Sequence, residues 1–226
     1  MEKMIIVNQK MYLNSLSEIE NFQNMTEDFK DKLIVFPSSI YLKKYIDMDF
    51  ITGSQNISAE KEGDYTGEIS GKSLKNLGVK YVMIGHHEMR KRYKEENNLI
   101  QRKIDRALEN NLKAILCIGE TIEEKINGKT EEVIKRELEN LNLNENVYVS
   151  YEPIWAIGTH ITPTKEEIEA ATKYIKSLKK VKVLYGGSVS DENIEILNQI
   201  PDLDGFLIGS SALQISSLKK IIEVVL

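Results

Sequence analysis

Cysteine is almost missing from this sequence of 226 residues, which contains only Cys117. A single cysteine cannot form an intrachain disulfide, and it excludes a cysteine-rich metal site. Long hydrophobic runs are missing too, because no apolar stretch approaches the roughly 18 residues that a membrane-spanning helix needs. The apolar N-terminal run ends at the polar Asn8, too early for a secretory signal. These absences predict a cytoplasmic protein with no membrane partner.

An excess of positive charge is also lacking. The 30 lysines and arginines are outnumbered by 35 acidic residues, which gives a formal net charge of -5. Such a chain has no overall basic field, so we expect no nucleic-acid partner. The three histidines do not follow a spacing typical of metal ligands, and we expect neither a metal nor another cofactor. No flexible linker divides the chain, which predicts a single domain over residues 1–226.

The sequence does contain a regular alternation of short apolar runs and longer amphipathic segments. The apolar runs, rich in Val, Ile and aromatic residues, are typical of parallel strands that are covered on both faces. The amphipathic segments have apolar residues at helical spacing, over 99–108, 133–141 and 168–178, and a short helix is expected over 40–46. Thr164 and Glu167 are placed to form a capping box at the start of the third of these helices. The expected strands are 4–7, 33–36, 50–52, 81–84, 114–118, 147–150, 181–184 and 205–208.

Alternating strands and helices predict right-handed βαβ units and a parallel sheet. Eight such units can close into a single-domain α/β fold, the (β/α)8 barrel. The pattern alone leaves a doubly wound open sheet as the alternative.

Unusual polar residues and glycines fall just after the expected strands. In a barrel, the loops that follow the strands build the functional site, so these residues should converge on one face. The convergence would bring together an acid, a base, a cation and backbone suited to an anion. The residues are Asn8 and Lys10 after the first strand, His86, His87 and Glu88 after the fourth, Glu152 after the sixth, Gly186, Gly187 and Ser188 after the seventh, and Gly209 and Ser210 after the eighth.

Glu152 and His86 are the candidates for acid–base chemistry. Pro153 ends the strand and keeps Glu152 extended, so that the carboxylate points from the strand tip into apolar surroundings that would make it a better base. His86 precedes an expected helix, whose positive end disfavours imidazolium and favours a neutral donor. The alternatives without a functional role are that Glu152 is a surface residue at a strand end and that His86 is a packed core residue. His87 could also be the neutral donor in place of His86.

Lys10 and the glycine-rich loops suit an anionic ligand. The Lys10 ammonium would attract a phosphate dianion and stabilise an enediolate oxygen, to which Asn8 could also donate. The Gly186-Gly187 turn leads into a helix expected to start at Ser190, and glycines let backbone N–H groups approach an anion there. The apolar loop 155–162 is a candidate lid. Each feature alone is compatible with a solvated lysine, an ordinary turn or packing on the barrel rim.

The chain resembles the triosephosphate isomerase family over nearly its whole length. The most specific match is Tyr-Glu-Pro-Ile-Trp-Ala-Ile-Gly-Thr at 151–159, and the others follow in family order. The resemblance implies an aldose–ketose isomerase that interconverts dihydroxyacetone phosphate and D-glyceraldehyde 3-phosphate through an enediolate, in glycolysis and gluconeogenesis. The other matching segments are 8–11, 55–56, 65–70, 84–86, 117–121, 185–189 and 204–209.

The resemblance also implies roles for single residues. Glu152 would move the proton, His86 would be the neutral electrophile, and Lys10 would bind the substrate. The resemblance further implies a homodimer in which the 55–70 segment enters the other subunit near Lys10. Other implied ligands of the substrate are Asn8 and the backbone N–H groups of Gly158, Ser188, Gly209 and Ser210, with Glu88 as a partner of Lys10.

Several positions depart from the family pattern. Gln9 replaces a usual Trp, His87 replaces a Ser that rests against the catalytic Glu, and Met89 replaces an Arg of an ion-pair network that reaches the subunit interface. Ser210 replaces a Gly, and His160 changes the hinge of the lid. These departures leave two other functions open, an isomerase of a four-carbon ketose phosphate and a non-catalytic phosphate-binding barrel.

Overall fold

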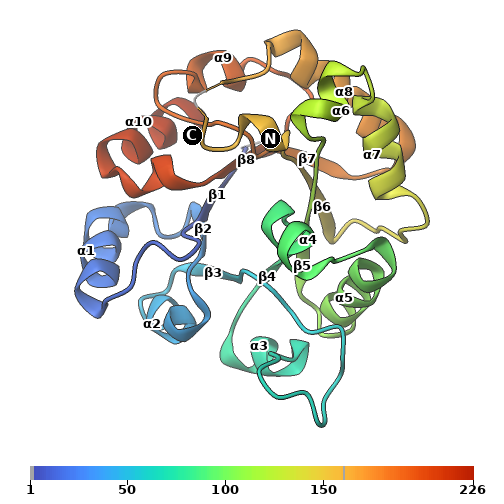
Figure 1. The fold of residues 1–226 in the computed structure, drawn as a ribbon. Coiled ribbons are helices and arrows are strands. Elements are labelled where there is room, and N and C mark those ends of the chain that lie inside the picture. Colours follow the sequence, from blue (N-terminus) through green and yellow to red (C-terminus); the bar gives the residue numbers. More distant parts are fainter. Residues whose placement is uncertain (1–2, 160) are drawn as a thin grey trace.

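A computed structural model of the chain describes residues 3–159 and 161–226. Eight parallel strands follow one another in chain order, and β1 pairs with both β2 and β8, so the sheet is a closed barrel inside a ring of helices (Figure 1). The predicted (β/α)8 barrel is confirmed, and the open sheet is excluded. The strands are β1 (Met4–Asn8), β2 (Leu33–Phe36), β3 (Ile51–Ser54), β4 (Tyr81–Ile84), β5 (Lys113–Ile118), β6 (Val147–Tyr151), β7 (Lys182–Tyr185) and β8 (Gly205–Ile208).

The strands bury both of their faces, which explains why they read as continuous apolar runs. Alternate residues point to opposite sides of a strand. In β6, Val147, Val149 and Tyr151 belong to the large core between sheet and helices, whereas Tyr148 packs in the barrel interior. The same alternation directs Glu152, just after the strand, to the interior side.

The helices lie where the amphipathic segments predict them. The capping box at the start of α8 is confirmed, because the Thr164 side chain accepts from the Glu167 N–H and the Glu167 carboxylate accepts from the Thr164 N–H. The helices are α1 (Leu16–Thr26), α2 (Leu42–Asp47), α3 (Gly71–Leu77), α4 (His87–Tyr93), α5 (Asn97–Glu109), α6 (Ile122–Ile126), α7 (Thr130–Leu138), α8 (Lys165–Leu178), α9 (Ile194–Asn198) and α10 (Ile215–Val225). Across the described residues, no helix has the length and apolar character to cross a membrane.

Two helix starts differ from the prediction. Ile40 lies in a 3-10 turn before α2 and is 79% exposed, so it does not contribute to the buried face of that helix. The helix expected from Ser190 begins only at Ile194, as the five-residue α9. Asn193 is the reason, because its side chain accepts from the Ser190 N–H at 2.9 Å and donates to the Ser188 carbonyl at 2.9 Å, which holds the preceding residues in a turn.

Candidate active site

Glu152 is fixed at the tip of β6 by close backbone packing against the end of β5. Its N–H donates to the carbonyl of Ile118 at 2.7 Å. Gly119 has no room for a side chain, since a Cβ there would lie 2.0 Å from the Glu152 carbonyl oxygen. The N–H of Gly119 is held by the Glu137 carboxylate at 2.9 Å. The backbone of Glu152 is therefore fixed at its N–H by Ile118 and packed at its carbonyl against Gly119.

The Glu152 carboxylate is buried and has no hydrogen-bond donor on either oxygen. Only 1% of the residue is exposed, and both Oε1 and Oε2 lack a partner. Burial disfavours the ionised form and raises the pKa of Glu152 to about 7. A carboxylate with this pKa and with free lone pairs is suited to accept a proton near neutral pH.

His86 faces Glu152 and is neutral. Its Nδ1 accepts from the Glu88 N–H at 3.4 Å at the start of α4, which places the remaining ring proton on Nε2. Nε2 lies 3.4 Å from Glu152 Oε2. Burial lowers the pKa of His86 to about 3, and the neighbouring His87 and Lys10 add to the effect. The sequence suggested the positive end of the helix as the reason for a neutral ring, and the structure adds burial as a cause.

His87 stacks against His86 but does not reach Glu152 by a hydrogen bond. The two ring centroids are 4.4 Å apart, and His87 Nδ1 is buried without a partner. Burial also lowers the pKa of His87, to about 4. His87 lines the same small hollow as Cys117 and Glu152.

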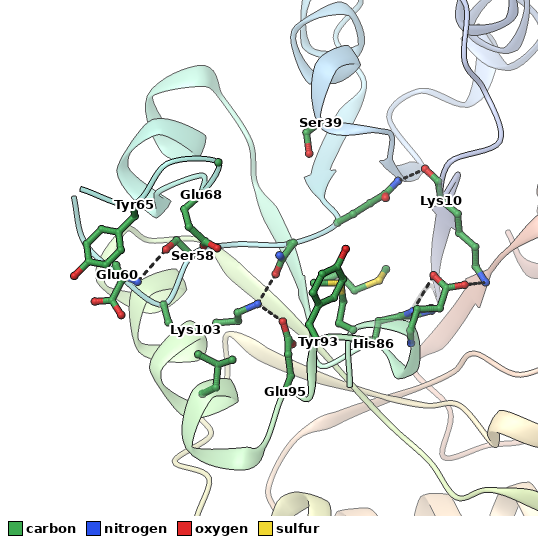
Figure 2. A pocket seen from close by; sticks show the side chains of 18 of the residues that line it. Lys10, Ser39, Ser58, Glu60, Tyr65, Glu68, His86, Tyr93, Glu95 and Lys103 are labelled. Carbon is green, nitrogen blue, oxygen red and sulfur yellow. Dashed lines mark hydrogen bonds and ion pairs between the residues drawn. The ribbon is translucent and has the colours of Figure 1, made fainter. Parts of the chain in front are cut away.

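Lys10 occupies a strained position at the mouth of β1. Its φ of 47° lies in the left-handed region, and its N–H is held by Asn8 Oδ1 at 3.0 Å and its carbonyl by Gln55 Nε2 at 2.8 Å. The ammonium lies 3.1 Å from Glu88 Oε1. These bonds direct the charge of Lys10 across the mouth of the barrel towards His86 (Figure 2).

The glycine-rich loops have two different surroundings. Gly209 lies beside Lys10, because a Cβ on it would be 3.9 Å from Lys10 Cε. Gly186 packs against Glu152 instead, where a Cβ would be 2.6 Å from Glu152 Cγ. The seventh loop therefore makes room for the carboxylate as well as presenting backbone to an anion.

The loop after β6 is held to this face at two points. Trp155 Nε1 donates to Glu120 Oε1 at 2.8 Å, so the indole is turned to Glu120 rather than to Glu152. Thr162 Oγ1 accepts from Asn193 at 3.1 Å, which ties the loop to the one that follows β7. Gly158 has a φ of 69° and is exposed. His160 lies outside the described residues, so the expectation about its hinge stays a prediction.

A cleft of about 610 Å³ runs from the site to the 55–70 segment (Figure 2). Asn8, Lys10 and His86 line one end of the cleft and Tyr65 lines the other, and Tyr93 lines the part between them. A buried ion pair between Lys103 and Glu95 forms its floor, and Lys103 also donates to Asn56 Oδ1 at 2.7 Å. Met89 reaches the same cleft, and Glu95 Oε2 has no partner.

Sequence reasoning missed some residues that support the site. Glu120 was noted only within a segment similar to the family, yet it is fully buried and accepts from the Tyr151 hydroxyl at 3.1 Å and from Trp155. Gln9 is buried with its amide bonded to the Tyr45 hydroxyl. The ligand atoms of His86, His87 and Glu88 lie within 4.8 Å of one another, which the sequence spacing did not suggest. Glu88 already has Lys10 as its cation, and the start of α4 disfavours a second positive charge.

Comparisons with known proteins found relatives that are similar to this chain over nearly its whole length. The family model described as triosephosphate isomerase matches residues 3–225. The triosephosphate isomerase of Francisella tularensis subsp. holarctica is 34% identical over 245 aligned positions, which cover 99% of this chain and 97% of that protein. That of Mycoplasmopsis pulmonis is 43% identical over 175 positions, covering 75% and 70%. A crystal structure of triosephosphate isomerase from Bartonella henselae superposes with a TM-score of 0.89 and 27% identity, covering 99% of both chains.

Proposed function

Since the chain belongs to the triosephosphate isomerase family, we propose that Glu152, His86 and Lys10 are the groups with which it interconverts dihydroxyacetone phosphate and D-glyceraldehyde 3-phosphate. The reaction moves one proton between the adjacent carbons C1 and C2. It needs a base for the carbon-bound proton and a donor for the substrate oxygens. The observation that carries the proposal is a buried Glu152 carboxylate, free of donors, 3.4 Å from Nε2 of a neutral His86.

The steps follow from the protonation states of these groups. Glu152 removes a proton from C1 of dihydroxyacetone phosphate, and the electron pair of the C–H bond moves towards the C2 carbonyl oxygen to give an enediolate. The Nε2–H of His86 donates to that oxygen, and because the ring is neutral it can assist proton exchange between the two oxygens. Glu152 then returns its proton to C2, which completes the aldose.

Lys10 supplies positive charge where negative charge develops. Its ammonium is balanced by Glu88 at 3.1 Å, and the substrate phosphate and enediolate oxygen would compete with Glu88 for it. Asn8 fixes the Lys10 backbone through its side-chain oxygen and stands at the same mouth. We assign phosphate binding to the backbone N–H groups of Gly158, Ser188, Gly209 and Ser210, which follow β6, β7 and β8.

A coupled assay on the purified protein, with triose phosphates and a four-carbon ketose phosphate, tests the substrate. We expect kcat/KM to favour the triose phosphates by roughly tenfold or more, because one extra carbon in a closed pocket typically costs about 1–3 kcal/mol. A ratio that favours the four-carbon sugar would make that sugar phosphate the assigned substrate. The proton-transfer chemistry would stay the same. No turnover of either would support the phosphate-binding barrel, although such a barrel has no need of a buried base.

We further propose that the chain forms a twofold homodimer through the cleft and the 55–70 segment. This segment protrudes from the ring of helices between β3 and α3 (Figure 1). Two exposed aromatic side chains line the cleft, Tyr65 and Tyr93, the latter 68% exposed. Met11 and Ile40, which directly follow the lining residues Lys10 and Ser39, are exposed as well. Apolar side chains gathered around one cleft favour burial against a second copy.

Tyr65→Glu should weaken this dimer at least tenfold, because the change places a charge in the apolar interface. Sedimentation equilibrium measures the dissociation constant. Ile126→Glu is the matched control, since Ile126 is 77% exposed on α6, away from the cleft. A fully active monomer of the unmodified protein, or equal effects of the two substitutions, would contradict the proposed interface.

Triose phosphates are intermediates of glycolysis and gluconeogenesis, and we place the enzyme in the cytoplasm with them. The only cysteine, Cys117, is buried in β5 and reduced, which is compatible with that compartment.

A further inference from the structure

Ser150 is a polar residue inside an apolar part of the barrel. It lies on β6 between Tyr148 and Glu152, on the same inward side, and none of its surface is exposed. Its partners in register are Cys117 on β5 and Leu184 on β7, both members of the interior core cluster. Bulky apolar residues usually fill the interior of such barrels. A hydroxyl at this position is therefore expected to have a hydrogen-bond partner.

The hydroxyl of Ser150 has no partner, and neither do the two oxygens of Glu152. Ser150 and Glu152 both pack against Gly186, because a Cβ placed on Gly186 would lie 2.6 Å from Ser150 Oγ, 2.6 Å from Glu152 Cγ and 3.1 Å from Glu152 Oε1. Buried polar atoms in proteins are nearly always paired. A hydroxyl donor and a carboxylate acceptor that lie against the same glycine form the natural pair.

We propose that Ser150 is a positioning residue, whose hydroxyl donates a hydrogen bond to the ionised Glu152 carboxylate before substrate binds. The inference rests on the proposed role of Glu152 as the base. It assigns to Ser150 the selection of one orientation of the carboxylate, and it does not place Ser150 against the substrate.

The Cys117 thiol is the competing donor on the same carboxylate. Both groups oppose the burial that raises the pKa of Glu152. A thiol is a weak donor compared with a hydroxyl. Ser150 also lies only two residues before Glu152 in the same continuous stretch of chain, so its place beside the carboxylate depends less on how neighbouring strands move. These two differences favour the hydroxyl.

The test is the pH dependence of Ser150→Ala. Loss of a donor to the ionised form raises the pKa of Glu152, so the acid limb of kcat/KM should shift to higher pH. On that limb kcat/KM should fall roughly three- to tenfold below the unmodified enzyme, with little change on the alkaline side. Difference infrared spectra should show the Glu152 carboxyl titrating at the same higher pH, its band being assigned by its loss in Glu152→Gln. Ser150→Thr keeps a hydroxyl and should restore the original profile.

Thr172→Val is the matched control, because Thr172 is fully buried on α8 with an unpartnered hydroxyl and is remote from Glu152 in the fold. It should leave the profile unchanged. An equal shift in Thr172→Val, or a shift in Cys117→Ala but not in Ser150→Ala, overturns the inference. If Glu152→Gln is inactive while Ser150→Ala titrates normally, only the role of Ser150 falls. If Glu152→Gln remains active, the proposed role of Glu152 as the base falls, and the inference about Ser150 falls with it.

Discussion

Replacing Glu152 with Gln should lower kcat by roughly two to four orders of magnitude, the usual contribution of a general base. The amide has nearly the shape of the carboxylate but cannot accept a proton. Because the residue is buried without a donor on either oxygen, an uncharged amide is not expected to destabilise the fold. Steady-state kinetics with either triose phosphate measure the loss, and circular dichroism checks the fold.

Glu137→Gln is the control for removing a buried carboxylate near the same strand ends. Glu137 holds the Gly119 N–H and lies 3.8 Å from Arg90, but it does not face His86. We expect less than about a tenfold change in its kcat. Similar losses in the two variants would argue against Glu152 as the base.

In the unmodified enzyme kcat/KM should decrease as the pH falls through about 7, because protonated Glu152 cannot act as a base.

His86→Gln should lower kcat by roughly two to three orders of magnitude, as expected when a preorganised donor to a developing oxyanion is lost. His87→Ser should cost less than about tenfold, because His87 stacks on His86 and its Nδ1 has no partner. The two substitutions form a matched pair of adjacent residues at the start of α4. An active His86 variant beside an inactive His87 variant would reverse the assignment of the electrophile.

The sequence predicted the strands to within one or two residues at their ends, and for a physical reason. Each strand of a closed parallel barrel is buried on both faces, so it is an uninterrupted apolar run bounded by polar residues. The same geometry places the residue after each strand at one end of the barrel. For this reason Lys10, His86 and Glu152 could be expected together, although they are 76 and 66 residues apart along the chain.

What the sequence could not show depends on pairs that form only in the fold. The turn before α9 is set by Asn193, whose contacts with Ser188 and Thr162 are not visible in a local pattern. Glu120 reads as an ordinary residue after a strand, yet it joins Tyr151 and Trp155. Ser150 stands within an apolar run and carries no signal until its surroundings are known.

Closure of the barrel between β1 and β8 determines when the enzyme can first work during its synthesis. Lys10 follows the first strand, and Gly209, which lies beside it, follows the last. A nascent chain on the ribosome would contain the proposed base, Glu152, and the proposed electrophile, His86, before the strand that brings Gly209 to Lys10. The proposed phosphate end of the site is thus completed last, so a chain that still lacks β8 is not expected to hold a phosphorylated substrate.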